Sequence, residues 1–273
     1  MYEARMRRLH LIDGTFELFR AHFAPVPYKP KKATLGLVRA MRALAADKDE
    51  APTHAAIAFD NPIRSFRNDL FAEYKSDEGV LPELREQFDE VEVEARKLGL
   101  VVWSMKEWET DDAIATACVK YASDFDQIRI LSPDKDFGQC LRGDHVVQVD
   151  RVRRKFIDEK SLRELRGIGP ASIADWLALV GDTADGIPGL AGFGDKSTAA
   201  LLAKFEHVEA VPDDFRAWPA AVRGRERLAA ELAANREKVA LYKRLATLVT
   251  DVPLPETAAE LAWRPPPREV LAS

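Results

Sequence analysis

Short runs of Val, Ile, Leu and Ala alternate with longer stretches of helical periodicity in the first half of the chain. Such apolar runs are typical of strands that are buried on both faces of a parallel sheet. They predict strands at residues 9–12, 55–59, 100–103, 128–131 and 146–149. Between most of them, apolar residues at helical spacing predict helices at residues 35–46, 82–98 and 111–122. This alternation favours an α/β domain whose mainly parallel central sheet is flanked by helices.

The pattern changes after about residue 160. Residues 161–203 have helical periodicity that two glycine clusters interrupt, at residues 167–170 and 186–194. Short helices joined by Gly-rich turns predict a small helical subdomain. We expect one further helix at residues 235–246, a strand at residues 247–252 and an irregular tail around the prolines at 265–267.

Composition excludes several classes of protein. The 273 residues are 47% hydrophobic, enough for a sizeable core in one large or two small domains. A net charge of −5 excludes a histone-like binder, although it leaves room for local basic patches. Two cysteines, Cys118 and Cys140, exclude a disulfide scaffold, and the five histidines lack zinc-site spacing. No apolar run reaches the ~20 residues of a membrane span and no signal peptide is recognisable, so we expect a cytoplasmic protein.

Carboxylates follow three of the predicted strands. Asp13 ends the first strand, Asp60 ends the second, and Asp134 and Asp136 come directly after the fourth. In an open parallel sheet, the carboxyl ends of the strands line one crevice. The sequence therefore predicts that three separate strands bring acids to one edge of the sheet.

Two further acidic groups adjoin predicted helices. Asp111 and Asp112 would lie in the first turn of the helix at residues 111–122, where the helix dipole favours anions. Glu109 converges with them only if it lies in the loop before the helix, which Thr110 as the N-cap would allow. Asp182 and Asp185 follow the apolar helix at residues 173–180 and begin the second glycine cluster.

A single Asp after a strand usually caps a turn, and acids at the start of a helix usually cap it. Five such groups favour a different interpretation, because packed carboxylates repel one another unless cations neutralise them. Oxygen ligands without His or Cys suit Mg²⁺ or Mn²⁺. An acid-lined crevice of this kind is typical of two-metal phosphodiester hydrolysis.

Taken together, these motifs resemble the 5′-nuclease, or flap endonuclease, superfamily, and in particular the 5′–3′ exonuclease domain of bacterial DNA polymerase I. The resemblance runs from about His10 to Val252. The motifs that carry it lie at residues 11–15 (Leu-Ile-Asp-Gly-Thr), 59–60, 66–75, 109–112, 134–136 (Asp-Lys-Asp), 181–189 and 235–247.

The resemblance implies a metal site of nine acids, none of which is replaced here, with two or more Mg²⁺ or Mn²⁺ ions. Which acid binds which ion stays open. The acids are Asp13, Asp60, Glu109, Asp111, Asp112, Asp134, Asp136, Asp182 and Asp185.

The resemblance also implies a helical arch over the site, at about residues 62–98. In it, Lys75 would contact the scissile phosphate and Tyr74 would stack on a base. Arg20 and Arg67 match positions that face phosphate. Glu78 stands where the family has Arg, and the acidic run at residues 83–94 is interpreted as a solvated outer face.

The second glycine cluster resembles a helix-hairpin-helix turn. Glycines allow a backbone to approach phosphates closely, and a helix N-terminus presents free N–H groups. The implied DNA-binding residues are Gly189, Gly192, Gly194, Lys196 and Ser197, and backbone carbonyls of the turn would hold K⁺. Gly186, Ala191 and Pro133 depart from the residues usual in the family. The basic run at residues 151–155 is a further candidate for backbone contacts.

We therefore expect a nuclease domain at residues 1–163, a helix-hairpin-helix subdomain that returns to the sheet at 164–255, and a tail at 256–273. The implied function is that of a stand-alone, metal-dependent 5′ nuclease. The sequence contains no sign of oligomerisation either way, so a monomer is the default expectation. Its substrate would be flapped, nicked or branched DNA, including RNA-primed ends, in replication or repair. Two alternatives stay open: a PIN-type ribonuclease, which the hairpin and Tyr74–Lys75 disfavour, and a catalytically weak branched-DNA-binding protein, which the complete set of acids disfavours.

Overall fold

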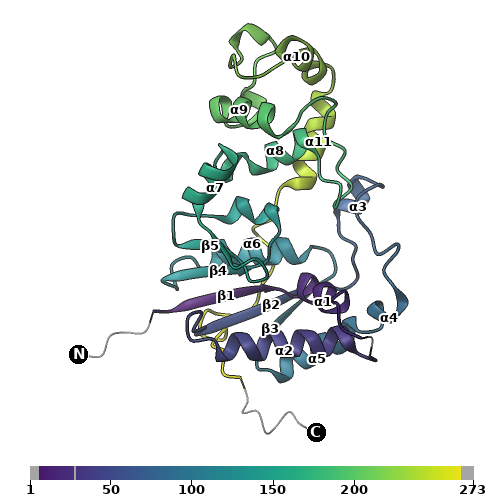
Figure 1. Ribbon diagram of the computed structural model, residues 1–273, viewed down its shortest axis with the longest axis vertical. Coiled ribbons are helices and arrows are strands. Elements are labelled where there is room, and N and C mark those ends of the chain that lie inside the picture. The colour runs from purple at the N-terminus through teal and green to yellow at the C-terminus, as the bar shows by residue number, and fades with distance from the viewer. Residues whose placement is uncertain (1–5, 28, 266–273) are drawn as a thin grey trace, which may run out of the picture.

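The computed structural model describes residues 6–27 and 29–265. A six-stranded sheet lies below a helical subdomain (Figure 1). The strands are β1 (Arg8–Asp13), β2 (His54–Asp60), β3 (Val101–Met105), β4 (Gln127–Leu131), β5 (Val146–Asp150) and β6 (Lys155–Ile157). The first five are the predicted strands, with ends shifted by at most two residues. The short antiparallel β6 has no signal of its own in the hydrophobic pattern.

The order of the strands is β3-β2-β1-β4-β5-β6, and all neighbouring pairs except β5–β6 are parallel. β1 therefore lies between β2 and β4, and Leu11 pairs with Ala56 on one side and Ile130 on the other. This arrangement confirms that the ends of β1, β2 and β4 lie side by side at one edge of the sheet.

Helices cover both faces of the sheet, which explains why its strands read as continuous apolar runs. One face packs against α1 (Gly14–His22), α2 (Lys32–Ala46) and α5 (Phe88–Lys97). The other face packs against α6 (Thr110–Lys120) and the chain from Leu248 to Leu261. In the described residues, no helix is long and apolar enough to cross a membrane.

The helix expected at residues 82–98 forms as two pieces, α4 (Pro82–Arg85) and α5. Gln87 lies at the break, where its buried side chain accepts hydrogen bonds from the Thr34 amide (3.1 Å) and hydroxyl (3.2 Å). Of the segment expected as an arch, α3 (Arg67–Leu70) stands away from the sheet, whereas α5 lies on it beside α2 (Figure 1). Leu84 of α4 is buried in the same core as α2 and α5.

The acidic run at residues 83–94 is therefore in part a packed surface. Lys31 pairs with Glu90 at 2.5 Å, and Asn61 donates to Asp89 at 2.8 Å. Glu92 is 6% exposed and accepts a hydrogen bond from Ser104. These contacts tie α5 to the sheet and its surroundings and neutralise some of its charge.

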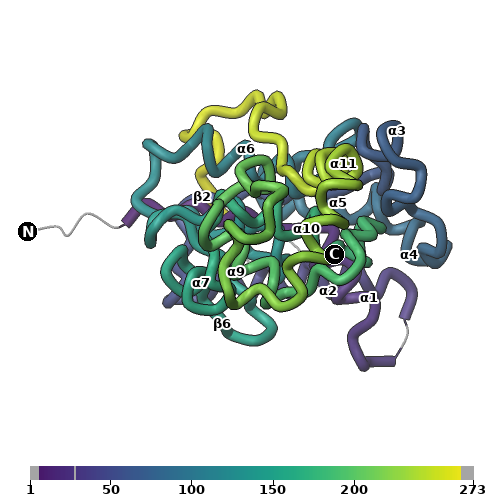
Figure 2. The backbone as a smooth tube through the Cα atoms, turned by 90° about the horizontal axis from the view of Figure 1, so that it is seen from above, coloured from purple at the N-terminus to yellow at the C-terminus, as the bar shows by residue number. Residues whose placement is uncertain are grey.

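The helical subdomain contains α7 (Glu159–Arg166), α8 (Ile173–Val180), α9 (Asp195–Phe205), α10 (Arg225–Ala234) and α11 (Arg236–Ala246). Its core includes Leu177, Leu201 and Leu245. α11 packs along α8 and leads the chain back to the sheet (Figure 1). Seen from above, α3 lies next to α11 (Figure 2), and the rings of Phe71 and Tyr242 meet there with centroids 6.0 Å apart.

The strand predicted at residues 247–252 is wrong. Three backbone N–H groups of this segment donate to side chains, and within the described residues the segment joins no strand of the sheet. Val249 donates to Asp112 at 2.8 Å, and Val252 donates to Thr116 at 3.1 Å, both on α6. Of the predicted tail, residues 256–265 are described and Trp263 packs against the sheet, where its indole donates to the Leu98 carbonyl at 2.9 Å. The irregular tail was expected around residues 265–267, of which Pro266 and Pro267 lie outside the described residues.

Candidate metal centre

Acids that end three strands meet at the sheet edge. Asp13 caps α1 by accepting from the Phe16 amide at 2.8 Å. Asp60 accepts from the Thr110 amide at 2.7 Å, which joins the end of β2 to the start of α6. Asp134 follows β4 and accepts from the Asp136 amide at 2.9 Å, at the start of the 3₁₀ helix η1 (Lys135–Cys140). Each carboxylate is thus held by a backbone N–H group at the carboxyl edge of the sheet, from its own turn for Asp13 and Asp134 and from the start of α6 for Asp60.

The N-terminus of α6 brings in the next group. Glu109 is its N-cap, one residue before the predicted Thr110, and forms a capping box with Asp112. Glu109 consequently lies just before the first turn of α6. This is the position that we predicted it must take to converge with Asp111 and Asp112. Asp111 and Asp112 lie in the first turn.

Asp112 and Arg67 form a buried ion pair that lies behind this group. Two parallel bonds of 2.7 Å join the guanidinium to both oxygens of Asp112. Arg67 also donates to the carbonyls of Leu245 (2.8 Å) and Thr247 (3.0 Å), and Asp112 also accepts from the Glu109 amide. Arg67 is 1% exposed and Asp112 is inaccessible. The resemblance implied that Arg67 faces phosphate, but its guanidinium is buried and cannot reach one. Arg67 instead fixes the start of α6 against the end of α11.

A second group of acids comes from η1 and the loop after α8. One carboxylate oxygen of each of Asp136, Asp182 and Asp185 lies within 4.8 Å of the others. Asp136 and Asp182 are 4% and 6% exposed. Oδ1 of Asp136 is buried and has no hydrogen-bond partner in the described part of the chain. A buried carboxylate oxygen without a donor is costly, and a cation would satisfy it.

Two lysines contact these acids. Lys75 Nζ lies 2.8 Å from Glu109 Oε2 and 3.0 Å from Asp185 Oδ1. Lys135 Nζ lies 2.5 Å from Asp182 Oδ2. The Lys75 amide also donates to the Asp185 carbonyl at 3.0 Å, so the arch segment and the loop after α8 are joined through backbone as well. Lys135 is not among the residues predicted from the sequence. Its position between Asp134 and Asp136, two predicted metal ligands, could have indicated that it contacts the acids.

Tyr74 lies in the interior next to Lys75. It is 4% exposed, and its hydroxyl donates to Glu109 Oε2 at 3.3 Å. Its ring belongs to the core of the helical subdomain. In this arrangement, the side chain orients Glu109 and is not available for stacking on a base.

Burial and mutual repulsion raise the pKa values of several of these acids. Burial raises the pKa of Asp13 to about 7, and the charges of Asp60 and Asp134 act in the same direction. Burial raises the pKa of Asp136 well above its ordinary value, with Asp134 and Asp185 adding to it. Eight of the nine predicted acids are linked through such charge effects: Asp13, Asp60, Glu109, Asp111, Asp134, Asp136, Asp182 and Asp185.

Glu109 differs from its neighbours. Burial alone would raise its pKa, but Lys75 and Arg67 outweigh burial and lower the pKa to about 2. The remaining acids have more negative charge than these cations neutralise. Oxygen-only donors, raised pKa values and the unpartnered Asp136 oxygen together fit hard divalent cations.

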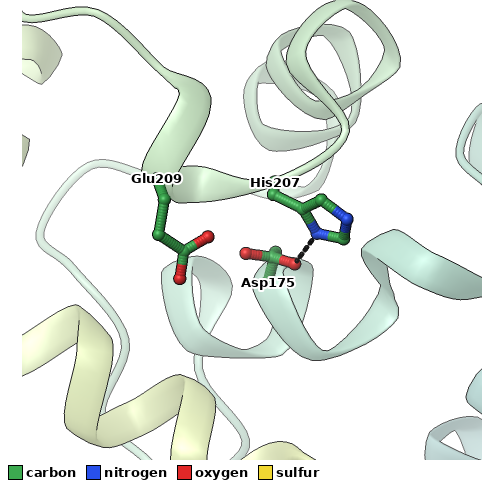
Figure 3. Close-up of side chains that lie close together, drawn as sticks. All are labelled: Asp175, His207 and Glu209. Carbon is green, nitrogen blue, oxygen red and sulfur yellow. Dashed lines mark hydrogen bonds and ion pairs between the residues drawn. The ribbon is translucent and has the colours of Figure 1, made fainter.

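A second cluster with metal-like composition lies elsewhere, on the helical subdomain. It combines Asp175 of α8 with His207 and Glu209 beside the short turn η3 (Val208–Ala210), as Figure 3 shows. His207 Nδ1 lies 3.0 Å from Asp175, and Lys243 of α11 places its ammonium 2.8 Å from both Asp175 and Glu209. Lys243 already provides the cation, so this cluster ties η3 and α11 to α8.

The predicted hairpin lies between α8 and α9. Gly189 has φ +70°, and a Cβ there would lie 2.5 Å from backbone atoms of Val180 and Gly181, so the turn is pressed against the end of α8. A Cβ on Gly192 would meet the Arg227 guanidinium, whereas one on Gly194 would meet nothing within 4 Å. Gly194 is the N-cap of α9. The surface around Gly194 is therefore open at a helix N-terminus.

The predicted phosphate contacts at that helix start are accessible. Lys196 is exposed and Ser197 is half-buried, both in the first turn of α9. The free N–H groups of this turn and the ammonium of Lys196 form a surface that suits an anion.

Arg20 lies on α1, away from the lysines that contact the acids. It pairs with Glu17 and lines a groove of about 870 Å³ together with Arg39, Arg151 and Arg154. The predicted basic run at residues 151–155 thus forms one wall of this groove, at the turn between β5 and β6.

Comparisons with known proteins agree with this architecture. Residues 8–167 match the family model of the 5′-3′ exonuclease N-terminal resolvase-like domain, and residues 168–269 match that of the 5′-3′ exonuclease C-terminal SAM fold. DNA polymerase I of Pseudomonas aeruginosa is 34% identical over 96% of this chain and 29% of its own length. The 5′-3′ exonuclease of Aquifex aeolicus is 28% identical over 96% of this chain and 88% of its own.

Among solved structures, the bacteriophage T5 D15 flap endonuclease, in a complex with DNA and metal ions, has a similar fold. It superimposes with a TM-score of 0.71 at 22% identity, over 88% of this chain and 89% of its own. The chain spans less than a third of the DNA polymerase I relatives that it matches.

Proposed function

The chain belongs to the 5′–3′ exonuclease family, and from this premise we propose that it is a structure-specific 5′ nuclease. It would hydrolyse phosphodiesters of DNA near a 5′ end with the help of divalent metal ions. The observation that carries the proposal is the group Asp136, Asp182 and Asp185, whose carboxylates lie within 4.8 Å of one another around an unpartnered buried oxygen. Carboxylates in this arrangement require cations.

We assign the acids to two groups according to their position. Asp13, Asp60, Asp111 and Asp134 face one another at the ends of β1, β2 and β4 and the start of α6, and Asp136, Asp182 and Asp185 form the second group. Mg²⁺ or Mn²⁺ suits both. When bound, such ions lower the pKa of water and stabilise negative charge on a phosphate.

The remaining predicted acids act through their neighbours. Both oxygens of Asp112 are occupied by Arg67, so its role is to hold the start of α6 in position. Glu109 stays ionised because Lys75 and Arg67 lower its pKa, and it anchors Lys75 at the edge of the crevice.

Lys75 is the residue we assign to the scissile phosphate. Its ammonium lies between the two groups of acids, and its side chain is 24% exposed, so a phosphate that enters the crevice can reach it. Tyr74 supports this placement through its hydroxyl bond to Glu109. Tyr74 and Arg67 are positioning residues in this scheme.

DNA would be held by the surface around Gly194, Lys196 and Ser197. The groove around Arg20 and residues 151–155, which five basic and four acidic side chains line, would be a second contact. The T5 flap endonuclease, whose structure contains DNA and metal ions, supports this proposal through its similar fold. Flapped, nicked and branched duplexes with DNA or RNA-primed 5′ ends are the proposed substrates, in replication or repair. K⁺ at the hairpin turn stays a prediction.

The test compares cleavage of a 5′-flap, a nicked duplex and single-stranded RNA, with and without Mg²⁺. We expect Mg²⁺-dependent cleavage of the two DNA substrates. The Asp136→Asn variant should lose it, whereas Asp144→Asn should not, because Asp144 is exposed before β5 at the opposite edge of the sheet. Cleavage of RNA alone would favour the ribonuclease alternative. DNA binding without cleavage at saturating Mg²⁺ or Mn²⁺ would contradict the enzyme proposal.

A further inference from the structure

Lys135 lies on the second group of acids, and none of the proposed steps uses it. Its Nζ is 2.5 Å from Asp182 Oδ2 and 3.8 Å from Asp136 Oδ1. The residue begins η1, between Asp134 and Asp136 in the sequence. The ammonium is the cation nearest to the Asp136 oxygen that otherwise has no partner in the described residues.

An ammonium and a divalent ion compete for this position. A metal ion binds a carboxylate oxygen at about 2.0–2.6 Å, and Lys135 already holds Oδ2 of Asp182 at 2.5 Å. Two cations on neighbouring oxygens of one small cluster repel each other strongly, because the site is partly buried. Binding of a divalent ion and contact with the Lys135 ammonium therefore largely exclude each other at this cluster.

The two active-site lysines differ in how they are held. Lys75 is tied by its own backbone to Asp185 and bridges Glu109 and Asp185. Among the residues that the structure describes, the ammonium of Lys135 pairs with Asp136 and Asp182 of the second group, and its side chain is 32% exposed. A flexible four-carbon stem that is one-third exposed can swing into solvent without disturbing η1.

We propose that Lys135 is a built-in counter-ion for the cluster of Asp136, Asp182 and Asp185. Without metal, its ammonium holds the carboxylates together and stabilises the fold. A divalent ion displaces it into solvent, so Lys135 sets the metal concentration at which this cluster fills. The inference rests on the proposed metal site.

The direct test uses the unaltered protein. An amine-acylating reagent is applied in EDTA and in Mg²⁺, without DNA, and the modified lysines are quantified by peptide mass spectrometry. Acylation of Lys135 should rise several-fold in Mg²⁺. Lys160, which is 83% exposed on α7, is the internal control and should react equally in both. Equal acylation of Lys135 under the two conditions would overturn the proposal.

The second test removes the charge. Lys135→Met should bind Mg²⁺ about tenfold more tightly in calorimetric titration, because a competing charge is gone. Its melting temperature in EDTA should fall, and its rise on adding Mg²⁺ should be larger than that of the unaltered protein. Lys135→Arg keeps the charge and should keep the weaker affinity, and Lys160→Met should match the unaltered protein.

Unchanged or weaker Mg²⁺ affinity in Lys135→Met would contradict the proposal. A Lys135→Met variant that folds only in Mg²⁺ would support it, because the lost counter-ion is then replaced by metal. Both tests measure metal binding without DNA. Failure of the proposed nuclease function would instead appear as tight Mg²⁺ binding by the unaltered protein with no cleavage.

Discussion

Asp112 and Asp136 are both almost inaccessible to solvent, yet their oxygens have opposite surroundings. Asp112 receives two bonds from Arg67 and two from backbone amides. Asp136 keeps one buried oxygen without a donor in the described residues. A satisfied buried carboxylate holds structure together, whereas an unsatisfied one attracts a cation. On this basis we propose that Asp112 is a positioning residue and that Asp136 binds metal.

Asp13 should behave as a metal-binding acid. Asp13→Asn should lower the rate of DNA cleavage in Mg²⁺ by at least about a hundredfold. DNA binding should be retained or strengthened, because repulsion of phosphate falls. The fold should persist, since Asn caps a helix as well as Asp does and Asp13 caps α1. Cleavage assays and gel shifts in EDTA measure the two effects, and a parallel loss of binding would speak against this role.

Arg67 should behave as a structural residue. Arg67→Met leaves Asp112 as an uncompensated buried charge, so the free energy of unfolding should fall by about 3–5 kcal/mol. Adding Asp112→Leu should recover part of the loss, which a double-mutant cycle in urea measures.

Arg64 offers a matched control for this experiment. It pairs with Asp69 at 3.1 Å, but both side chains are largely exposed. Arg64→Met should change the free energy of unfolding by less than about 1 kcal/mol. Similar losses for the two arginines would refute the structural role of Arg67.

At the scale of elements, the loop between α8 and α9 serves two purposes. Its first half delivers Asp182 and Asp185 to the acids, and its second half forms the open N-terminus of α9. An isolated bridge between Asp182 and Ile187 closes the first half. In the proposed function, metal binding and DNA contact would therefore be joined by a few residues of one loop.

The glycines of this loop should differ in what they tolerate. Gly189→Ala forces a Cβ to within 2.5 Å of the Val180 backbone at φ +70°, so it should destabilise the protein by about 1–3 kcal/mol. Gly194→Ala meets nothing within 4 Å and should leave the melting temperature unchanged while weakening DNA binding. Thermal unfolding and fluorescence anisotropy with a duplex measure the pair. A stable Gly189→Ala variant would contradict the tight turn.

Lys196 tests the DNA contact at α9. Lys196→Ala should weaken binding and reduce the slope of log affinity against log salt concentration by up to about one unit. The side chain is exposed, so the melting temperature should not change. An unchanged slope would mean that Lys196 is an ordinary surface charge.

At the scale of the whole molecule, the excess of negative charge comes from the nine acids of the candidate metal centre. The formal charge is −5, and without the nine predicted acids the rest of the chain would carry +4. Divalent ions therefore change both the local charge of the site and the net attraction of the protein for DNA.

Metal-free stability should depend on pH in the direction that these acids dictate. The folded-state pKa of Asp13 is raised to about 7 from 3.8, and those of Asp60, Asp111, Asp136 and Asp185 are raised as well. The folded state therefore binds protons more tightly than the unfolded state, and stability falls as pH rises through the folded-state pKa. In EDTA, the melting temperature should decrease between about pH 5 and pH 8, whereas saturating Mg²⁺ should flatten the profile.

Groups whose pKa is lowered on folding act in the opposite direction without cancelling this trend. Glu109 has a pKa lowered to about 2, so the stability it contributes is lost only as pH falls from about 4.5 toward 2. Burial lowers the pKa of His10 and of His54, which favours folding as pH rises toward 6.5, but these are two groups against five acids. A metal-free melting temperature that is constant or rises from pH 5 to pH 8 would contradict the prediction.

The sequence by itself determined the sheet, because strands that are buried on both faces must be apolar throughout and must end where polar residues begin. It also determined which acids end those strands, and the motif spacing identified the family. β6 escaped prediction because three residues, two of them exposed and one half-buried, have no periodicity to detect. The segment at residues 247–252 was misjudged because apolar composition cannot reveal that side chains of α6 take its backbone N–H groups.

Only the tertiary structure decided what each charged residue does. Arg67 and Lys75 look equivalent along the chain. In the structure Arg67 is buried behind the acids, whereas Lys75 is partly exposed at the edge of the crevice. Asp112 and Asp136 also look equivalent along the chain, but Asp112 is paired with Arg67 and Asp136 keeps an oxygen without a hydrogen-bond donor in the described residues. The physical reason is that the role of a buried charge depends on which partners reach it, and these partners come from helices and loops more than a hundred residues apart.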